Sequence, residues 1–309
     1  MNPVIYFLVR SLFIGIGLSN FISLSDATFY ITGFIGLLIG IIIIYLYEGS
    51  NHFIRKLSSI FISITLSTIT INLSHTLYLD NTPILWLSIY TIGICFIISL
   101  SSKKVLNRTS YYLIYPSIGL LILELILLIP SFSFDNFYTP KLDHINTIKG
   151  SLYFTLISIS PVLTLNYEKD KKKLILTYII SSLSIIIISI IMVGTLGYKE
   201  TLLYRYPEYI ILKRIHFSNF FTNVDNIFFF TILTDLTISL SCFIKEFSSN
   251  IKKRLVYTCL LILLTNLICL KSSWLCLLFN YLYIPLLILL ILGILSKKVK
   301  LTKRVRIIW

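Results

Sequence analysis

Charged residues are scarce in this sequence: they make up 13% of its 309 residues, whereas 56% are hydrophobic. Soluble domains carry about 25% charged residues, which form the polar coat that keeps them in water. A chain with half that charge lacks such a coat. The composition therefore argues against a soluble enzyme, a disordered protein and a nucleic-acid-binding protein, and it favours a membrane protein.

Cysteine, histidine, proline and glycine are also few, with 5, 4, 8 and 12 residues. No two cysteines form a CxxC pair, and all five lie in or beside apolar runs, so we expect small buried thiols rather than disulfides or a zinc site. The four histidines are far apart in sequence. We therefore expect no metal site and no cofactor, and the absence of proline- or glycine-rich linkers argues for one domain.

Ten apolar segments have the length of about 20 residues that a membrane-spanning helix needs. Their residues are 4–24, 27–47, 57–79, 83–101, 110–132, 150–168, 173–195, 220–244, 254–271 and 273–296. Many are rich in isoleucine and valine, but membrane strands need only about 9–11 alternating residues. The length of these runs therefore predicts helices. The first has no small-residue cleavage site, so we expect a retained span rather than a signal peptide.

Lysine and arginine are distributed unevenly between the two sets of connecting loops. The loops after spans 2, 4, 6 and 8 and the C-terminal tail hold 19 of the 27 basic residues, and the opposite loops hold 7. Basic loops face the cytoplasm in most membrane proteins. The distribution predicts a multi-pass protein of a cell membrane with an even number of spans and both termini in the cytoplasm.

Two spans contain residues that interrupt helices. Span 1 holds Gly15-Ile16-Gly17, and span 6 holds Ser158-Ile159-Ser160-Pro161. Taken singly, these are also explained by close packing of small residues and by a tolerated proline kink. Breaks at corresponding positions of two inverted halves, however, indicate a transporter-type binding site near the midplane. Free backbone groups at such breaks can bind the ammonium and carboxylate groups of an amino acid.

A few polar residues lie inside otherwise apolar spans. Glu124 lies in the middle of span 5, Asp235 lies well inside span 8, and Ser67 and Thr70 belong to a polar face of span 3. Charged groups in lipid are costly, so the two acids should face protein or water, as part of a ligand pocket or a proton or ion pathway. Hydrogen bonding between helices is the alternative explanation. Arg10 lies near the cytoplasmic end of span 1, and we expect it to reach the membrane interface.

The connection 196–219 has an unusual pattern. Ile211, Leu212 and Ile215 share one face of a short helix whose basic residues lie elsewhere, which is typical of a helix at the membrane surface. Asp225 follows at the start of span 8, where an acid is favoured by the helix dipole.

The same region resembles the endospore germination permease family, the B subunits of nutrient germinant receptors within the amino acid/polyamine/organocation transporter superfamily. The residues that carry the resemblance are Tyr206-Pro207, Leu212-Lys213-Arg214-Ile215, Phe220-Phe221 and Asp225, together with Ile5 to Gly17, Ala27 to Gly40 and the charged run 168–173. The resemblance implies an all-α integral membrane protein of ten helices in two inverted five-helix repeats, about 1–132 and 150–296, in a single domain.

The resemblance also implies a function and partners. Such a subunit binds an amino acid or similar nutrient at the inner membrane of a spore and promotes germination, in complex with a membrane-anchored A-type subunit and a C-type lipoprotein. From the residues we expect the ligand at Gly15, Ile16, Gly17, Ser67, Thr70, Ser158, Ser160 and Asp235, with Glu124 and Asp235 available for proton or ion coupling.

Three alternatives remain open at this point. One is a secondary amino acid transporter of the same fold, and another is a scaffold that stabilises partners. A membrane enzyme is the least supported, because such enzymes need clustered Asp, Glu or His residues at the membrane surface. The acids and histidines of this sequence are scattered.

Overall fold

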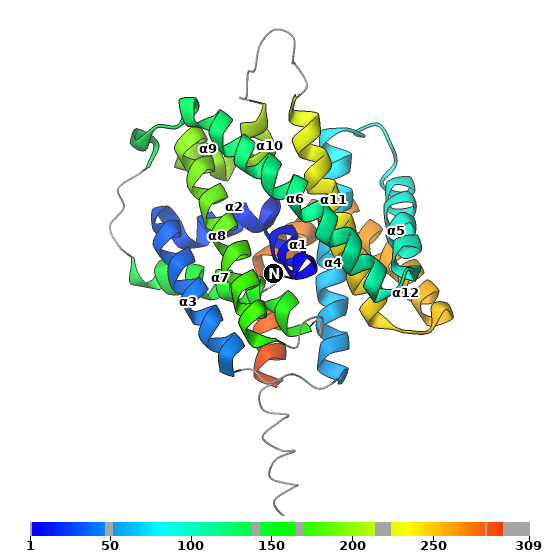
Figure 1. Ribbon diagram of the computed structural model, residues 1–309. Helices are drawn as coiled ribbons and strands as arrows, with labels where there is room; N and C mark the ends of the chain where they lie inside the picture. The colour runs from blue at the N-terminus through cyan, green and yellow to red at the C-terminus, as the bar shows by residue number, and fades with distance from the viewer. Residues whose placement is uncertain are drawn as a thin grey trace, which may run out of the picture.

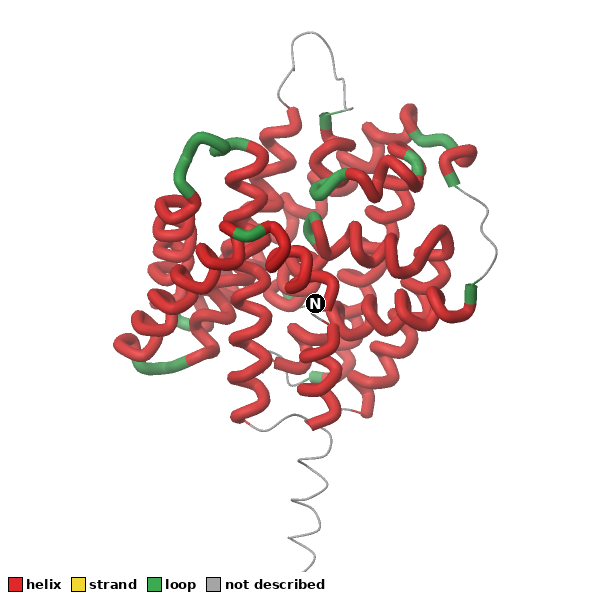
Figure 2. The backbone as a smooth tube through the Cα atoms, turned by 180° about the vertical axis from the view of Figure 1, so that it is seen from behind, coloured by secondary structure: helices red, strands yellow, loops and turns green. Residues whose placement is uncertain are grey.

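The computed structural model of the protein describes residues 2–46, 52–137, 143–164, 170–213, 224–281 and 283–292 (Figure 1). Within these ranges the chain is helical and contains no strand (Figure 2). Among the described residues, five helices are long and apolar enough to cross a membrane, and a sixth span results if the bent pair at the N-terminus counts as one. The fold is therefore all-α, and its apolar helices fit a membrane-embedded protein.

Each predicted span coincides with a helix or with a pair of shorter helices. In chain order these are α1 (Pro3–Phe13) with α2 (Ile16–Ser25), α3 (Phe29–Leu46), α4 (His52–Leu77), α5 (Ile84–Leu100), α6 (Lys103–Leu128), α7 (His144–Thr164), α8 (Lys171–Leu196), α11 (Val224–Phe247), α12 (Ile251–Leu270), and α13 (Ser272–Tyr281) with a final helix Tyr283–Leu292. Short helices α9 (Tyr198–Leu203) and α10 (Pro207–Leu212) lie in the connection before α11. The predicted tail after residue 292 lies outside the described residues.

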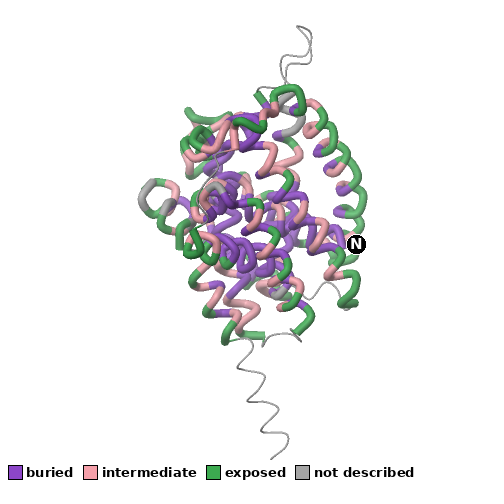
Figure 3. The backbone as a smooth tube through the Cα atoms, turned by 90° about the vertical axis from the view of Figure 1, so that its left-hand side faces the viewer, coloured by how far each residue is buried: buried purple, intermediate pink, exposed green. Residues whose placement is uncertain are grey.

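Helix α1 forms the centre of the bundle, where it contacts α4, α6, α7, α8 and α11 (Figure 1). Its residues Val4 to Val9 are all at most 1% exposed. Buried backbone lies at the centre of the molecule and exposed backbone at its periphery (Figure 3). An apolar helix surrounded by protein on all sides needs no polar face, which explains why α1 is apolar almost throughout.

The helices of the first half pair with those of the second. Helix α1 contacts α7, α3 contacts α8, α4 contacts α11, and α5 contacts α12. Counted as predicted spans, each partner lies five spans further along the chain. These contacts include the expected proximity of spans 1 and 6, although α3 packs most extensively on α7, and α1 on α8 and α11.

Polar contacts bring the helix ends together in two groups. On one side, Lys103 pairs with Glu246 at 2.8 Å and Arg254 donates to the Ser99 carbonyl at 2.7 Å, which joins ends of α5, α6, α11 and α12. On the other, Asn136 donates to the Gly194 carbonyl at 2.6 Å. The grouping is the one that alternating spans require.

The predicted break in span 6 is wrong within the described residues, because α7 continues through Pro161 to Thr164. Proline lacks an N–H, so the carbonyl of Ile157, four residues earlier, loses its helical partner. The Ser160 hydroxyl donates to that carbonyl at 3.0 Å. The neighbouring serine thus gives this carbonyl a donor in place of the missing N–H.

Candidate functional site

The first span is interrupted at Gly15, as the sequence predicts. Gly15 has φ +66°, a left-handed conformation that glycine adopts without strain, and it caps the N-terminus of α2. The two halves of the span are bent by 66°. A side chain at Gly15 would overlap the ring of Tyr206, and one at Gly17 would meet the Leu12 carbonyl oxygen. The break therefore depends on both glycines.

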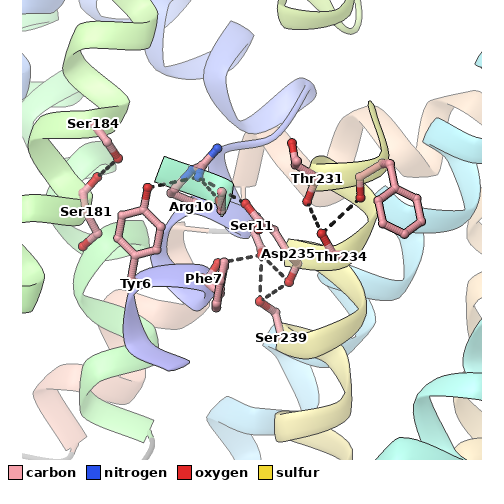
Figure 4. Close-up of polar contacts among 12 residues, drawn as sticks. Tyr6, Phe7, Arg10, Ser11, Ser181, Ser184, Thr231, Thr234, Asp235 and Ser239 are labelled. Carbon is pink, nitrogen blue, oxygen red and sulfur yellow. Dashed lines mark hydrogen bonds and ion pairs between the residues drawn. The ribbon is translucent and has the colours of Figure 1, made fainter. Parts of the chain in front are cut away.

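Arg10 lies one turn before this break and pairs with Asp235 of α11 (Figure 4). The Arg10 Nη1 lies 3.4 Å from the Asp235 carboxylate, and the two side chains are 11% and 1% exposed. The same nitrogen donates to the Tyr6 hydroxyl at 3.0 Å and to the Ser117 hydroxyl of α6 at 2.9 Å. The expectation that Arg10 reaches the membrane interface is wrong, because its charge is satisfied inside the bundle.

Two serines join α1 to α11 beside this ion pair. The Ser11 hydroxyl lies 2.7 Å from that of Ser239 and 3.0 Å from the Asp235 carbonyl oxygen (Figure 4). Ser239 itself donates to the Asp235 carbonyl at 2.6 Å. These contacts hold α11 against α1 and so place Asp235 opposite Arg10.

A third charged side chain reaches the break from the connection before α11. Helix α10 is buried, and the Glu208 carboxylate accepts a hydrogen bond from the Gly15 N–H. Burial raises the pKa of Glu208 to about 7. The hydrogen bond from Gly15 lowers this pKa, and the negative charge of Glu124 raises it further. The predicted surface position of this segment is wrong for residues 207–212, because its apolar residues pack inward; Ile215 lies outside the described residues.

These charged groups surround a cavity of about 50 Å³ at the break. Its lining comprises Arg10, Phe13, Ile14, Leu18, Glu124, Ile185, Ile188, Glu208, Thr231 and Ile232. One water needs roughly 10–15 Å³ of such volume, so the cavity holds roughly three to five waters or a solute of similar size. Besides Arg10, the lining has two carboxyl groups, from Glu124 and Glu208, among apolar side chains.

The structure brings some of the predicted site residues to this cavity and leaves others apart. Glu124 lines it, Asp235 is reached through Arg10, and the backbone at Gly15, Ile16 and Gly17 forms the adjoining break.

The four predicted hydroxyl residues do not line the cavity. The hydroxyls of Ser67 and Thr70 donate to backbone carbonyls of their own helix, α4, at 3.0 and 2.7 Å. The Ser158 hydroxyl lies 2.9 Å from the Tyr178 hydroxyl, and Ser160 supports α7. Their contacts are those expected of residues that join or support helices.

Sequence reasoning missed Arg10 and Glu208 as site residues. Each had a signal: Arg10 is the only basic residue within span 1, and an aspartate in another span is its natural partner. Glu208 gave a weaker signal, since an acid after a proline at the start of a helix is common on surfaces. Only the inward packing of α10 makes it a cavity residue.

No protein-family model matches the sequence, and no curated protein matches it either. Within the described residues, no group of three or more His, Cys, Asp or Glu side chains is arranged to hold a metal ion. Conclusions about function therefore rest on the geometry of the cavity and on the resemblance described above.

Proposed function

We propose that the chain is a transporter-like membrane protein that binds a small polar solute, an amino acid or a similar nutrient, at the break between α1 and α2. The observation that carries this proposal is the buried Arg10–Asp235 pair beside a cavity that Glu124 and Glu208 also line. Ionisable groups inside membrane helices are costly and mark solute or ion pathways. An irregular backbone at that depth is tolerated where it lines a cavity.

The helix pairing supports the finer fold proposal. We propose ten membrane helices in two inverted five-helix repeats, with both termini in the cytoplasm. The contacts of α1, α3, α4 and α5 with helices five spans further along are what two related halves packed face to face would make. The continuous α7 departs from the transporter pattern of two broken helices, so among the described residues the irregular backbone at the site comes from the α1–α2 break.

The specific form of the proposal is the transporter-like subunit of a spore nutrient receptor, assembled with an A-type subunit and a lipoprotein. It rests on the resemblance at residues 204–235. A secondary amino acid transporter of the same fold would use the same cavity, because both functions begin with solute binding. Solute movement is what distinguishes them.

Binding to protein in lipid nanodiscs tests the proposal. A panel of the twenty amino acids is measured by calorimetry on wild type and on Ile188→Trp, which fills the cavity from α8. The matched control is Ile187→Trp, since Ile187 is the adjacent residue and faces outward, 43% exposed. We expect at least one amino acid to bind, Ile188→Trp to weaken it at least about tenfold, and Ile187→Trp to leave it unchanged.

Two results would overturn the proposal: no member of the panel binds, or both tryptophan variants bind like wild type. Uptake of the bound solute by proteoliposomes then separates the two forms. Uptake supports a transporter, whereas binding without uptake supports a receptor subunit.

A further inference from the structure

The Glu208 carboxylate binds a backbone N–H at the start of a helix, where a solute carboxylate could bind instead. The N-terminus of a helix attracts anions because its first N–H groups are free and its dipole is positive there. At the N-terminus of α2, the Gly15 N–H is already taken by the Glu208 carboxylate. That carboxylate comes from α10, 193 residues away along the chain, rather than from a neighbouring capping residue.

The contact is more than a helix cap. Ordinary caps use a short serine, threonine, aspartate or asparagine next to the helix, whose remaining lone pairs face water. Glu208 is 7% exposed and lines the cavity, and its second oxygen, Oε2, has no hydrogen-bond partner among the described residues. Burying a polar atom without a partner is costly. The Glu208 side chain therefore lines the cavity while its second oxygen stays buried without a partner among the described residues.

Helix α10 is held in this position from several sides. The Tyr206 ring packs at Gly15, and its hydroxyl accepts a hydrogen bond from Asn72 of α4 at 2.6 Å. The Tyr209 ring contacts Tyr78 and Phe229, with ring centres 5.9 and 6.0 Å apart. These contacts orient Glu208 toward Gly15 in the absence of any solute.

We propose that Glu208 is a built-in competitor for carboxylate-bearing solutes, and therefore a specificity-determining residue of the site. A solute carboxylate and the Glu208 carboxylate would compete for the Gly15 N–H. When Glu208 is ionised, its charge and that of Glu124 repel a second carboxylate in the cavity. This inference rests on the proposed solute-binding function.

The first test compares glycine with glycinamide, which has the same skeleton but an uncharged amide in place of the carboxylate. Binding to Glu208→Ala and Glu208→Gln is measured in nanodiscs, with Glu200→Ala at an exposed position of α9 as the control. We expect both Glu208 variants to bind glycine at least about tenfold tighter than wild type, because removing a like charge removes its repulsion. Glycinamide should change less than about threefold.

The opposite result would overturn the inference. If Glu208 instead receives a solute's ammonium group, both variants bind glycine and glycinamide more weakly. If Glu208 is only a helix cap, Glu208→Gln binds glycine and glycinamide with the same affinity as wild type. Gel filtration and the melting temperature of each variant exclude unfolding as the cause.

The second test needs no bound solute. Thr231 lines the cavity, and Thr231→Cys is introduced into a chain whose five cysteines are replaced by alanine. Reaction rates are compared for 2-carboxyethyl and 2-hydroxyethyl methanethiosulfonate. We expect Glu208→Ala to raise the carboxylate-to-hydroxyl rate ratio at least about fivefold.

The two tests separate the inference from the proposed function. An unchanged rate ratio overturns the inference, even when amino acids bind. A raised ratio without binding of any amino acid keeps Glu208 as a competitor for anions and overturns the proposed function.

Discussion

Arg10 and Asp235 illustrate how single residues determine the interior of this protein. Each would be an unpaired charge in an apolar helix, and each is satisfied only because α1 and α11 are adjacent. Tyr6 and Ser117 provide further hydrogen bonds to the guanidinium. The pair therefore specifies which helices meet, whatever its net contribution to stability.

The first prediction concerns this pair. Arg10→Met leaves the buried Asp235 carboxylate without its partner, and Asp235→Asn leaves the buried Arg10 guanidinium without a counter-charge. Breaking a buried pair in this way costs about 3–5 kcal/mol. The double variant removes both charges, so we expect its stability to lie closer to that of wild type than either single variant. The free energy of unfolding of each variant is measured by denaturant titration of the protein in detergent. Additive losses in the double variant would show that the two side chains do not interact.

At the scale of elements, α7 and the α1–α2 pair respond differently to helix-breaking residues. Gly15 adopts a left-handed conformation and its N–H is bound by a carboxylate from α10, so the helix ends there and restarts. Pro161 lies inside a continuous helix, and Ser160 donates to the Ile157 carbonyl that the proline leaves without a backbone donor. In both segments a side chain binds a backbone group at the helix-breaking residue.

The second prediction tests the compensation in α7. Ser160→Ala leaves the Ile157 carbonyl without its donor, and an unsatisfied buried acceptor costs about 1–3 kcal/mol. Pro161→Ala supplies a backbone N–H that restores the helical bond to this carbonyl, so in that background we expect the same serine substitution to cost much less. The four unfolding free energies form a double-mutant cycle. Equal costs in both backgrounds would mean that Ser160 does not support the proline.

At the scale of the whole molecule, two sets of helix ends lie at opposite sides of a bundle with an apolar exterior. The side that joins Lys103, Glu246 and Arg254 is the one whose loops carry most of the basic residues. Exposed apolar side chains such as Leu38, Ile97 and Leu263 then face lipid rather than water. These features fit a membrane-embedded protein, and the alternation of its helices is what the next experiment tests.

The third prediction tests the orientation. Lys104 lies in the first turn of α6 and Asp143 directly before α7, at helix ends on opposite predicted sides. Lys104→Cys and Asp143→Cys are introduced separately into the full chain without its native cysteines. We expect a membrane-impermeant maleimide to label Asp143→Cys in intact cells, and Lys104→Cys only after the membrane is opened. Labelling of Lys104→Cys in intact cells, with Asp143→Cys protected, would reverse the proposed orientation. The cysteine-less chain serves as the background control.

The sequence by itself determined the helical class, the positions of the long apolar helices and the break at Gly15. These properties depend on local composition: the length of an apolar run decides between helix and strand, and glycine permits the left-handed conformation at any depth. The proximity of spans 1 and 6 was also predicted, but from two interruptions of which the described residues contain only the one in span 1.

Only the tertiary structure decided the content of the site. The partner of the Ile157 carbonyl at Pro161 depended on the direction of the Ser160 hydroxyl, and the position of Arg10 inside the bundle depended on the approach of Asp235 from 225 residues away. Glu208 became a cavity residue because α10 packs inward onto Gly15. Each of these outcomes depends on a partner distant in sequence or on a side-chain rotamer, and hydrophobic periodicity carries information about neither.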